Sequence, residues 1–230
     1  MRSILRTIDR PLARDIALVC LADTIVGMSF GAIAVGAGLP AWLPMLLSVL
    51  VFAGAAQFMF VGIVAAGGNP ITAVVAGLLV NARHVPFGFA VGDLLDGGWL
   101  RRLAGTHLMM DESVAFALAQ QDPARRRAAY WTCALSLFAC WNVGVVIGAT
   151  GGGALGDTAA LGLDAAFPAV LLALVVPALR DAATRRAALT GALVALATAP
   201  LLPAGLPVLL ALTGMPAGRG RTVPAPQDAP

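Results

Sequence analysis

The stretch TIVGMSFGAIAVGAGLPAWLPMLLSVLVFAGAAQFMFVGIVAAGGNPITAVVAGLLVNA (24–82) runs for 59 residues without an Asp, Glu, Lys or Arg. A helix needs about 20 apolar residues to cross the roughly 30 Å hydrocarbon core of a bilayer, so this run holds two spans and part of a third. Gly-Pro turn signals at 38–40 and 67–70 divide it. The spans predicted here are 15–37, 43–66 and 70–92.

The composition of the whole chain agrees with a membrane protein. Hydrophobic residues make up 59% of the sequence and charged residues 12%, against about 25% charged residues in ordinary globular domains. Such a chain cannot cover its core with polar surface in water, so lipid must be its solvent. All 15 basic residues are Arg, and no basic stripe with interleaved aromatic residues occurs, which excludes nucleic-acid binding.

Three further apolar stretches predict spans at 129–151, 161–180 and 186–202, followed by a short apolar piece at 207–215. The predicted fold is an all-α, polytopic integral membrane helix bundle of six to seven membrane segments, with one or two broken or re-entrant helices. We expect a basic cytoplasmic lead (1–14), a single transmembrane transport domain (15–215) and a disordered tail (216–230).

The arginines predict the orientation, because loops rich in Arg face the cytoplasm. The lead, the triplet 125–127 and the group around 180–186 should be cytoplasmic, which places the N-terminus inside. Residues 93–127 leave two alternatives. In the slightly favoured one, 70–92 crosses fully, Arg101 and Arg102 lie outside against the rule, and an irregular segment 104–121 returns. In the other, 70–92 is re-entrant and 93–127 stays inside.

The sequence carries no sign of catalysis. Hydrolase, zinc-protease and nucleotide-binding motifs are absent, and the two His residues lack metal-ligand spacing. We therefore expect a protein that is not an enzyme and has neither a cofactor nor a metal.

The element NARHVPFG (81–88) puts a charge in the middle of a predicted span. Pro86 should break the helix beside Arg83, since it lacks a donor and clashes with the preceding turn. Broken helices at membrane depth are tolerated around cavities or inside protein. Arg83, with Asn81 and His84 nearby, is a candidate to bind the carboxylate of a solute. The alternative, weighed about equally, is a helix end whose Arg reaches the interface.

Two adjacent acids, Asp111 and Glu112, precede the apolar run VAFAL (114–118). They favour a simple helix start, because acidic residues stabilise the first turn of a helix. The functional alternative is a proton-titrating carboxylate, or the counter-ion of Arg83.

Asp23 and Gln57 are two more polar residues inside predicted spans. Asp23 is a candidate for proton coupling or for a structural pair with an Arg. Gln57 follows a run of small residues that allows close helix approach, so it hydrogen-bonds either a neighbouring helix or a solute.

Four stretches carry a family resemblance: VFAGAAQFMFVGIVAAG (51–67), NPITAVVAGLLVNARHVPFG (69–88), DESVAFAL (111–118) and GLDAAFPAVLLALVVPALR (162–180). In their order and spacing the chain resembles the large subunit of the AzlC-type branched-chain amino acid permeases, the LIV-E exporter family. The resemblance covers about 15–215. The chain departs from it around Asp23, where a more apolar, proline-containing run is expected.

The resemblance implies export of branched-chain or similar neutral amino acids by proton-coupled secondary transport in the cell inner (plasma) membrane. It also implies an AzlD-like small hydrophobic membrane subunit as partner. The residues then divide into a substrate-binding set (Gln57, Asn81, Arg83 and His84) and a proton-coupling set (Asp111, Glu112 and Asp23). The alternative function is a non-transporting membrane scaffold. The oligomeric state, homo-oligomers included, stays open.

Overall fold

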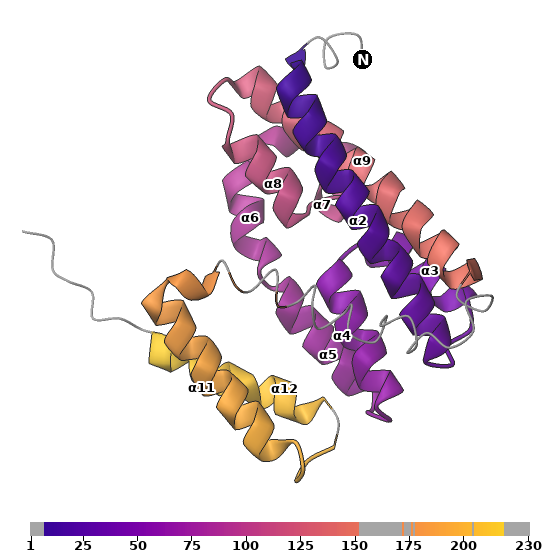
Figure 1. The fold of residues 1–230 in the computed structure, drawn as a ribbon. Helices are drawn as coiled ribbons and strands as arrows, with labels where there is room; N and C mark the ends of the chain where they lie inside the picture. Colours follow the sequence, from indigo (N-terminus) through magenta and orange to yellow (C-terminus); the bar gives the residue numbers. More distant parts are fainter. Residues whose placement is uncertain (1–6, 152–171, 173–175, 177, 204, 219–230) are drawn as a thin grey trace, which may run out of the picture.

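A computed structural model describes residues 7–151, 172, 176, 178–203 and 205–218. All regular elements in these ranges are helices, which confirms the predicted all-α class (Figure 1). In chain order they are α2 (Arg10–Gly36), α3 (Trp42–Leu50), α4 (Gly54–Ala65), α5 (Pro70–Asn81), α6 (His84–Val91), η1 (Gly92–Leu95), α7 (Trp99–His107), α8 (Asp111–Leu118), α9 (Pro123–Gly151), η2 (Ala178–Arg180), α11 (Ala182–Thr198), α12 (Leu206–Leu210) and η3 (Ala211–Gly218).

Three helical segments are long and apolar enough to cross a membrane: Arg10–Gly36, Pro70–Leu95 and Pro123–Gly151. They confirm the spans predicted at 15–37, 70–92 and 129–151. Many of their large apolar side chains are exposed, among them Leu18, Leu78 and Leu135. In a membrane protein such surfaces face the lipid tails, so exposed leucine needs no other explanation here.

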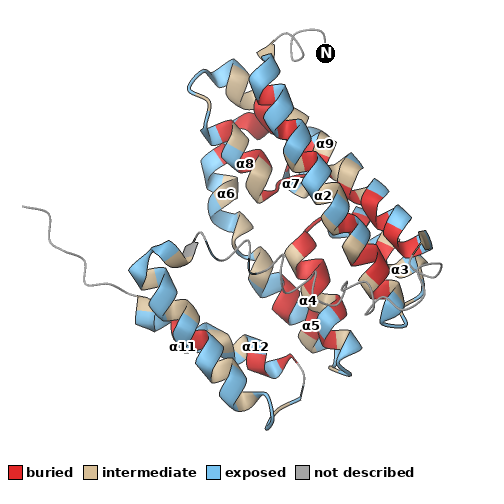
Figure 2. Ribbon diagram, viewed as in Figure 1, coloured by how far each residue is buried: buried red, intermediate tan, exposed pale blue. Residues whose placement is uncertain are grey.

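The helices α2 and α9 lie side by side and run in the same direction. Asp9 pairs with Arg125 where the two helices begin, and further along Gly27 and Gly31 face Trp141 and Val145. In a membrane, small residues spaced four apart let two backbones come close enough for extensive van der Waals contact. This packed pair forms the main wall of the bundle, and buried residues concentrate along it (Figure 2).

The predicted span 43–66 is wrong, because this stretch forms two short helices that fold back on each other. α3 runs against the direction of α9, with Ser48 bonded to Asn142 and Phe52 packed on Phe138. The chain then leaves helical geometry at 51–53. The Gln57 amide of α4 donates to the carbonyls of Leu47 and Val51 at 3.1 and 3.0 Å, which folds α4 back against the end of α3. The pair is therefore a re-entrant hairpin.

The segment from α5 to η1 is broken where the sequence predicts, at Ala82 and Arg83, but it continues across the bundle. Residues 99–118 then form a second re-entrant hairpin, α7 and α8, which starts from the face opposite to that of the first hairpin (Figure 1). Tyr130 of α9 donates to the Gly105 carbonyl at 2.7 Å and holds α7 in place. The segment 104–121 is irregular, as predicted, but it turns back as a hairpin, so the predicted return of this segment across the membrane is wrong.

This topology removes the conflict over the arginines. Since 43–66 does not cross, the crossing at 70–95 returns the chain to the face where α2 begins. There Arg126 and Arg127 of α9 bond Asp93 of η1, and Arg101 of α7 stacks over Trp131. The placement of Arg101 and Arg102 outside is wrong. Most of the described arginines gather at one face, which the positive-inside rule assigns to the cytoplasm.

The chain after the unplaced stretch forms a helical hairpin of α11 with α12 and η3. Gly191 lies against the Ala211 backbone, and Gly205 approaches Thr72 of α5 and Ile63 of α4. The predicted span 186–202 overlaps α11, which is not among the three described helices that are long and apolar enough to cross a membrane. Most of the predicted span 161–180 lies outside the described residues. Residues 216–218 of the predicted tail belong to η3, and the rest of the tail is outside the described residues as well.

Replacing Asp9 by Asn should slightly lower the melting temperature at neutral pH. A hydrogen bond from Arg125, and a second from the Leu12 amide, hold the pKa of Asp9 below its ordinary value of 3.8. A carboxyl with a lowered pKa stabilises the folded state above its unfolded pKa, and this contribution disappears as the pH falls through the folded pKa. The difference between the two proteins should therefore vanish in acid, as thermal melts from pH 7 to pH 2 would measure. A constant difference would contradict the role of the charge.

Candidate functional site

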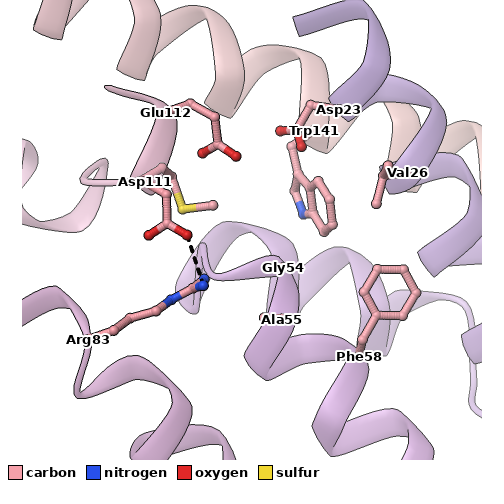
Figure 3. A pocket seen from close by; sticks show the side chains of 10 residues that line it. Asp23, Val26, Gly54, Ala55, Phe58, Arg83, Asp111, Glu112 and Trp141 are labelled. Atoms are coloured by element: carbon pink, nitrogen blue, oxygen red, sulfur yellow. Dashed lines mark ion pairs between the residues drawn. The ribbon is translucent and has the colours of Figure 1, made fainter. Parts of the chain in front are cut away.

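Three chain breaks meet in the middle of the bundle: 51–53 between α3 and α4, 82–83 between α5 and α6, and 108–110 between α7 and α8. They surround a cavity of about 110 Å³ that α2 and α9 close from the other side (Figure 3). Its wall consists of Asp23, Val26, Gly54, Ala55, Phe58, Arg83, Met110, Asp111, Glu112 and Trp141. Four residues that the sequence singled out, from three separate segments, are thus brought together.

Arg83 and Asp111 form an ion pair on one wall of this charged cavity. Nη1 of Arg83 lies 2.8 Å from Oδ2 of Asp111, and each side chain keeps about a third of its surface exposed, at 34% and 33%. Arg83 sits in the break because Pro86 stops α5 from continuing, and Asp111 is the first residue of α8, where a negative charge is favourable. The sequence gives Asp111 and Glu112 as the candidate counter-ions of Arg83, and in the structure Asp111 forms the ion pair.

Several polar atoms around the charged cavity are buried without a hydrogen-bond partner. Among the described residues these atoms are Asp23 Oδ2, Asn81 Oδ1, Arg83 Nε, Asp111 Oδ1 and Glu112 Oε2. Native proteins leave few buried polar groups unpaired, because each costs about 1–3 kcal/mol. Four of the five belong to residues that line the cavity, so the unsatisfied hydrogen-bonding capacity concentrates at one place. Such a site suits a polar guest.

A second, more open cavity of about 270 Å³ lies on the other side of the same breaks. Adjacent residues line the two spaces: Ala53 and Gly54, then Met109 and Met110. Asn81 and His84 face the second cavity, and Nδ1 of His84 lies 3.0 Å from the Asn81 carbonyl oxygen. These two predicted site residues therefore line a different cavity from the one that holds the Arg83–Asp111 pair.

Gln57 does not line the charged cavity, unlike four of the other predicted site residues. It is 1% exposed, and its amide is bonded to Leu47, Val51 and Trp141. These bonds occupy its donor and acceptor groups and fix the tip of the α3–α4 hairpin. The structure supports the helix-linking alternative for this residue, and its role in substrate binding stays a prediction.

Trp141 contributes more to the site than the sequence indicated. Its ring is 2% exposed, lines the charged cavity and packs near Phe30 and Phe58. The neighbouring residue Asn142 accepts a hydrogen bond from Ser48 at 2.7 Å. The sequence does contain a signal for the importance of Trp141. This Trp lies near the middle of its span, whereas Trp residues of membrane proteins usually lie at the membrane interface.

Replacing Trp141 by Phe should keep an aromatic side chain, although a smaller one, and remove the donor to Gln57 Oε1, which lies 3.1 Å away. The amide oxygen would then be buried without a partner, at a cost of about 1–3 kcal/mol. We expect a clearly lower melting temperature in detergent. Trp99→Phe is the matched control, since Trp99 is 72% exposed and should tolerate the change. Equal melting temperatures for both variants would contradict this role of Trp141.

Broken helices that surround a polar cavity at membrane depth are features of membrane proteins that transport solutes. Residues 18–155 match the family model described as AzlC protein, and the chain belongs to this family. It is 26% identical to the branched-chain amino acid transport protein AzlC of Bacillus subtilis (strain 168) over 197 residues. This alignment covers 83% of this chain and 76% of the relative.

A second relative is an uncharacterized membrane protein of Helicobacter pylori, 24% identical over 132 residues, or 56% of this chain and 58% of the relative. No solved structure matches the chain significantly. The family match covers α2 to α9 and leaves out the α11–η3 hairpin. The chain is thus a helical membrane protein related to transport proteins.

Proposed function

We propose that this protein exports branched-chain or similar neutral amino acids across the inner (plasma) membrane by proton-coupled secondary transport, with an AzlD-like small membrane subunit. The observation that carries the proposal is the cavity in the middle of the bundle, whose wall holds a cation, three carboxylates and apolar side chains. The name of the Bacillus subtilis relative supports the solute class.

In this proposal, some of the predicted site residues bind the solute and others carry the proton. Arg83 binds the carboxylate of the solute through Nε, which no protein group occupies, and the Asp111 contact holds the guanidinium in position. Asn81 and His84 in the second cavity contact the solute on its way, while Gln57 holds the hairpin tip. Asp111, Glu112 and Asp23, the three carboxyl groups of the cavity wall, carry the coupled proton in this proposal.

Efflux from vesicles tests the proposal. Vesicles containing the protein and its partner, loaded with leucine, valine or isoleucine, should release them faster than empty vesicles, and an imposed pH gradient should change the rate. A non-transporting scaffold would show neither effect.

Replacing Glu112 by Gln should flatten the pH dependence of this efflux, because the amide cannot take up the coupled proton. Asp122→Asn is a control at an exposed helix end, where Asp122 accepts from the Arg125 amide. A pH profile identical to that of the unaltered protein would remove Glu112 from proton coupling.

A further inference from the structure

The cavity wall holds more acidic than basic side chains. Arg83 is the one basic residue among the lining residues, and Asp111 already pairs with it at 2.8 Å. Asp23 and Glu112 line the same space, and neither has a basic side chain within ion-pair distance among the described residues. The cavity therefore holds two carboxyl groups for which the described chain supplies no cationic partner.

We propose that Asp23 and Glu112 together bind the ammonium group of the transported solute, and that this contact decides which solutes are accepted. The inference rests on the proposed function, since it assigns the ammonium end of the same amino acid site. It separates the two unpaired carboxylates from Asp111, whose partner is Arg83.

The two carboxylates reach the cavity from different helices. Asp23 projects from α2 and Glu112 from α8, and both line the cavity together with Trp141 (Figure 3). One oxygen of each, Oδ2 and Oε2, is fully buried and has no hydrogen-bond partner in the part of the chain that the structure describes. A primary ammonium offers three donors on one atom and can satisfy both oxygens at once.

Neutral atoms of the wall also favour a cation. The Trp141 ring lines the cavity, and an aromatic ring attracts an ammonium group over its face. The bond from Trp141 Nε1 to the buried Gln57 fixes the ring. This arrangement gives Gln57 an indirect influence on the site, because it positions the ring that the solute would touch.

The volume identifies the part of the solute that fits. A cavity of about 110 Å³ is smaller than the roughly 150 Å³ that holds a benzene molecule. It accommodates an ammonium group and the carbon that bears it, while a branched side chain needs more room. Arg83 Nε, also unpartnered on the same wall, is then placed for the carboxylate of the same molecule.

The proposal predicts that binding requires the ammonium group of the solute and does not depend on the Arg83–carboxylate contact alone. A solute that keeps the ammonium and loses the carboxylate should still bind, whereas one that loses the ammonium should not. For leucine these two analogues are 3-methylbutylamine and 4-methyl-2-oxopentanoate. The second brings no cationic group to the two carboxyl groups that lack a partner.

Calorimetric titration of the purified full chain with leucine and with the two analogues tests the proposal. We expect 3-methylbutylamine to bind. We expect 4-methyl-2-oxopentanoate to bind at least about tenfold more weakly than the amine, because the oxo acid has no ammonium group to form the hydrogen-bonded charge contact. Asp23→Asn and Glu112→Gln should each weaken amine binding about tenfold. Asp15→Asn is the matched control, an exposed acid on the same helix as Asp23.

The outcomes separate the two proposals. Equal binding of the oxo acid and the amine, no binding of the amine, or unchanged amine binding by both variants would overturn the ammonium site. The titrations with unaltered protein decide this even if a variant fails to fold. Amine binding with the expected selectivity, combined with no amino acid efflux from vesicles, would leave the ammonium site standing and reject the transport function.

Discussion

Arg83→Ala is expected to reduce amino acid efflux to background while the protein still reaches the membrane. The change removes the guanidinium that holds Asp111 at 2.8 Å and whose unpartnered Nε is offered to the solute. Loss of a hydrogen bond to a charged group costs about 1.5–3 kcal/mol, which corresponds to a loss of more than about tenfold in solute binding. Efflux from vesicles, normalised to the amount of inserted protein, measures the effect.

Arg102→Ala is the matched control for this variant. Arg102 also pairs with an aspartate, Asp96, but at 3.5 Å and with both side chains about two-thirds exposed, at 64% and 66%. Exposed pairs contribute little, so efflux should be unchanged. Arg83→Lys keeps the charge without the planar fork and should give intermediate activity. Normal efflux by Arg83→Ala would exclude this residue from solute binding.

Gly148→Leu is expected to prevent α2 and α9 from packing, and so to remove most of the folded protein. A Cβ atom at Gly148 would overlap the Met28 carbonyl oxygen, and one at Gly144 would overlap the Thr24 carbonyl oxygen. Overpacking usually costs about 1–3 kcal/mol. Here the atoms in the way belong to the backbone, which cannot rotate away as a side chain can. The loss of folding stability should therefore reach or exceed the upper end of this range. Size-exclusion chromatography and melting in detergent measure it.

Gly151→Leu provides the control in the same helix, because a Cβ atom at Gly151 meets no atom of the described residues within 4 Å. It adds the same side chain three residues further along α9. A folded, monodisperse Gly148→Leu protein with the melting temperature of Gly151→Leu would show that close approach of the two backbones is not required.

The charged cavity also joins the two proposed roles of the carboxylates. When the solute leaves, Asp23 and Glu112 lose the ammonium group and can take up protons in its place. Competition of this kind between an amine and protons for the same oxygens would couple export to proton entry. The Glu112→Gln pH profile and the amine titration examine the two halves of this exchange separately.

The sequence-based prediction of spans was wrong mainly at the re-entrant hairpins. A re-entrant hairpin and a full span have similar lengths and the same apolar composition, so hydropathy does not distinguish 43–66 from a crossing helix. The distinction depends on Gln57, whose amide bonds the end of α3, and on Trp141 of α9, which bonds Gln57. These contacts join residues up to 84 positions apart, and no local pattern shows them.

The sequence predicts the glycine contacts between α2 and α9 only in part. Gly27 and Gly31, like Gly144 and Gly148, have the four-residue spacing that is typical of closely packed membrane helices. That spacing predicts a close approach but does not identify the partner helix, because both pairs, and other small residues, are compatible with several arrangements. The structure supplies the partner through the backbone atoms that each glycine faces.

The amino-acid sequence by itself determined the solvent, the helical class, three membrane crossings, the break beside Arg83 and the short set of polar residues at membrane depth. These properties follow from local composition, since the cost of placing backbone and charge in lipid applies residue by residue. Only the tertiary structure decided that Asp111 pairs with Arg83, that Gln57 is turned away from the charged cavity, and that Asp23 and Glu112 face it without a basic partner. Such choices depend on which distant segments meet.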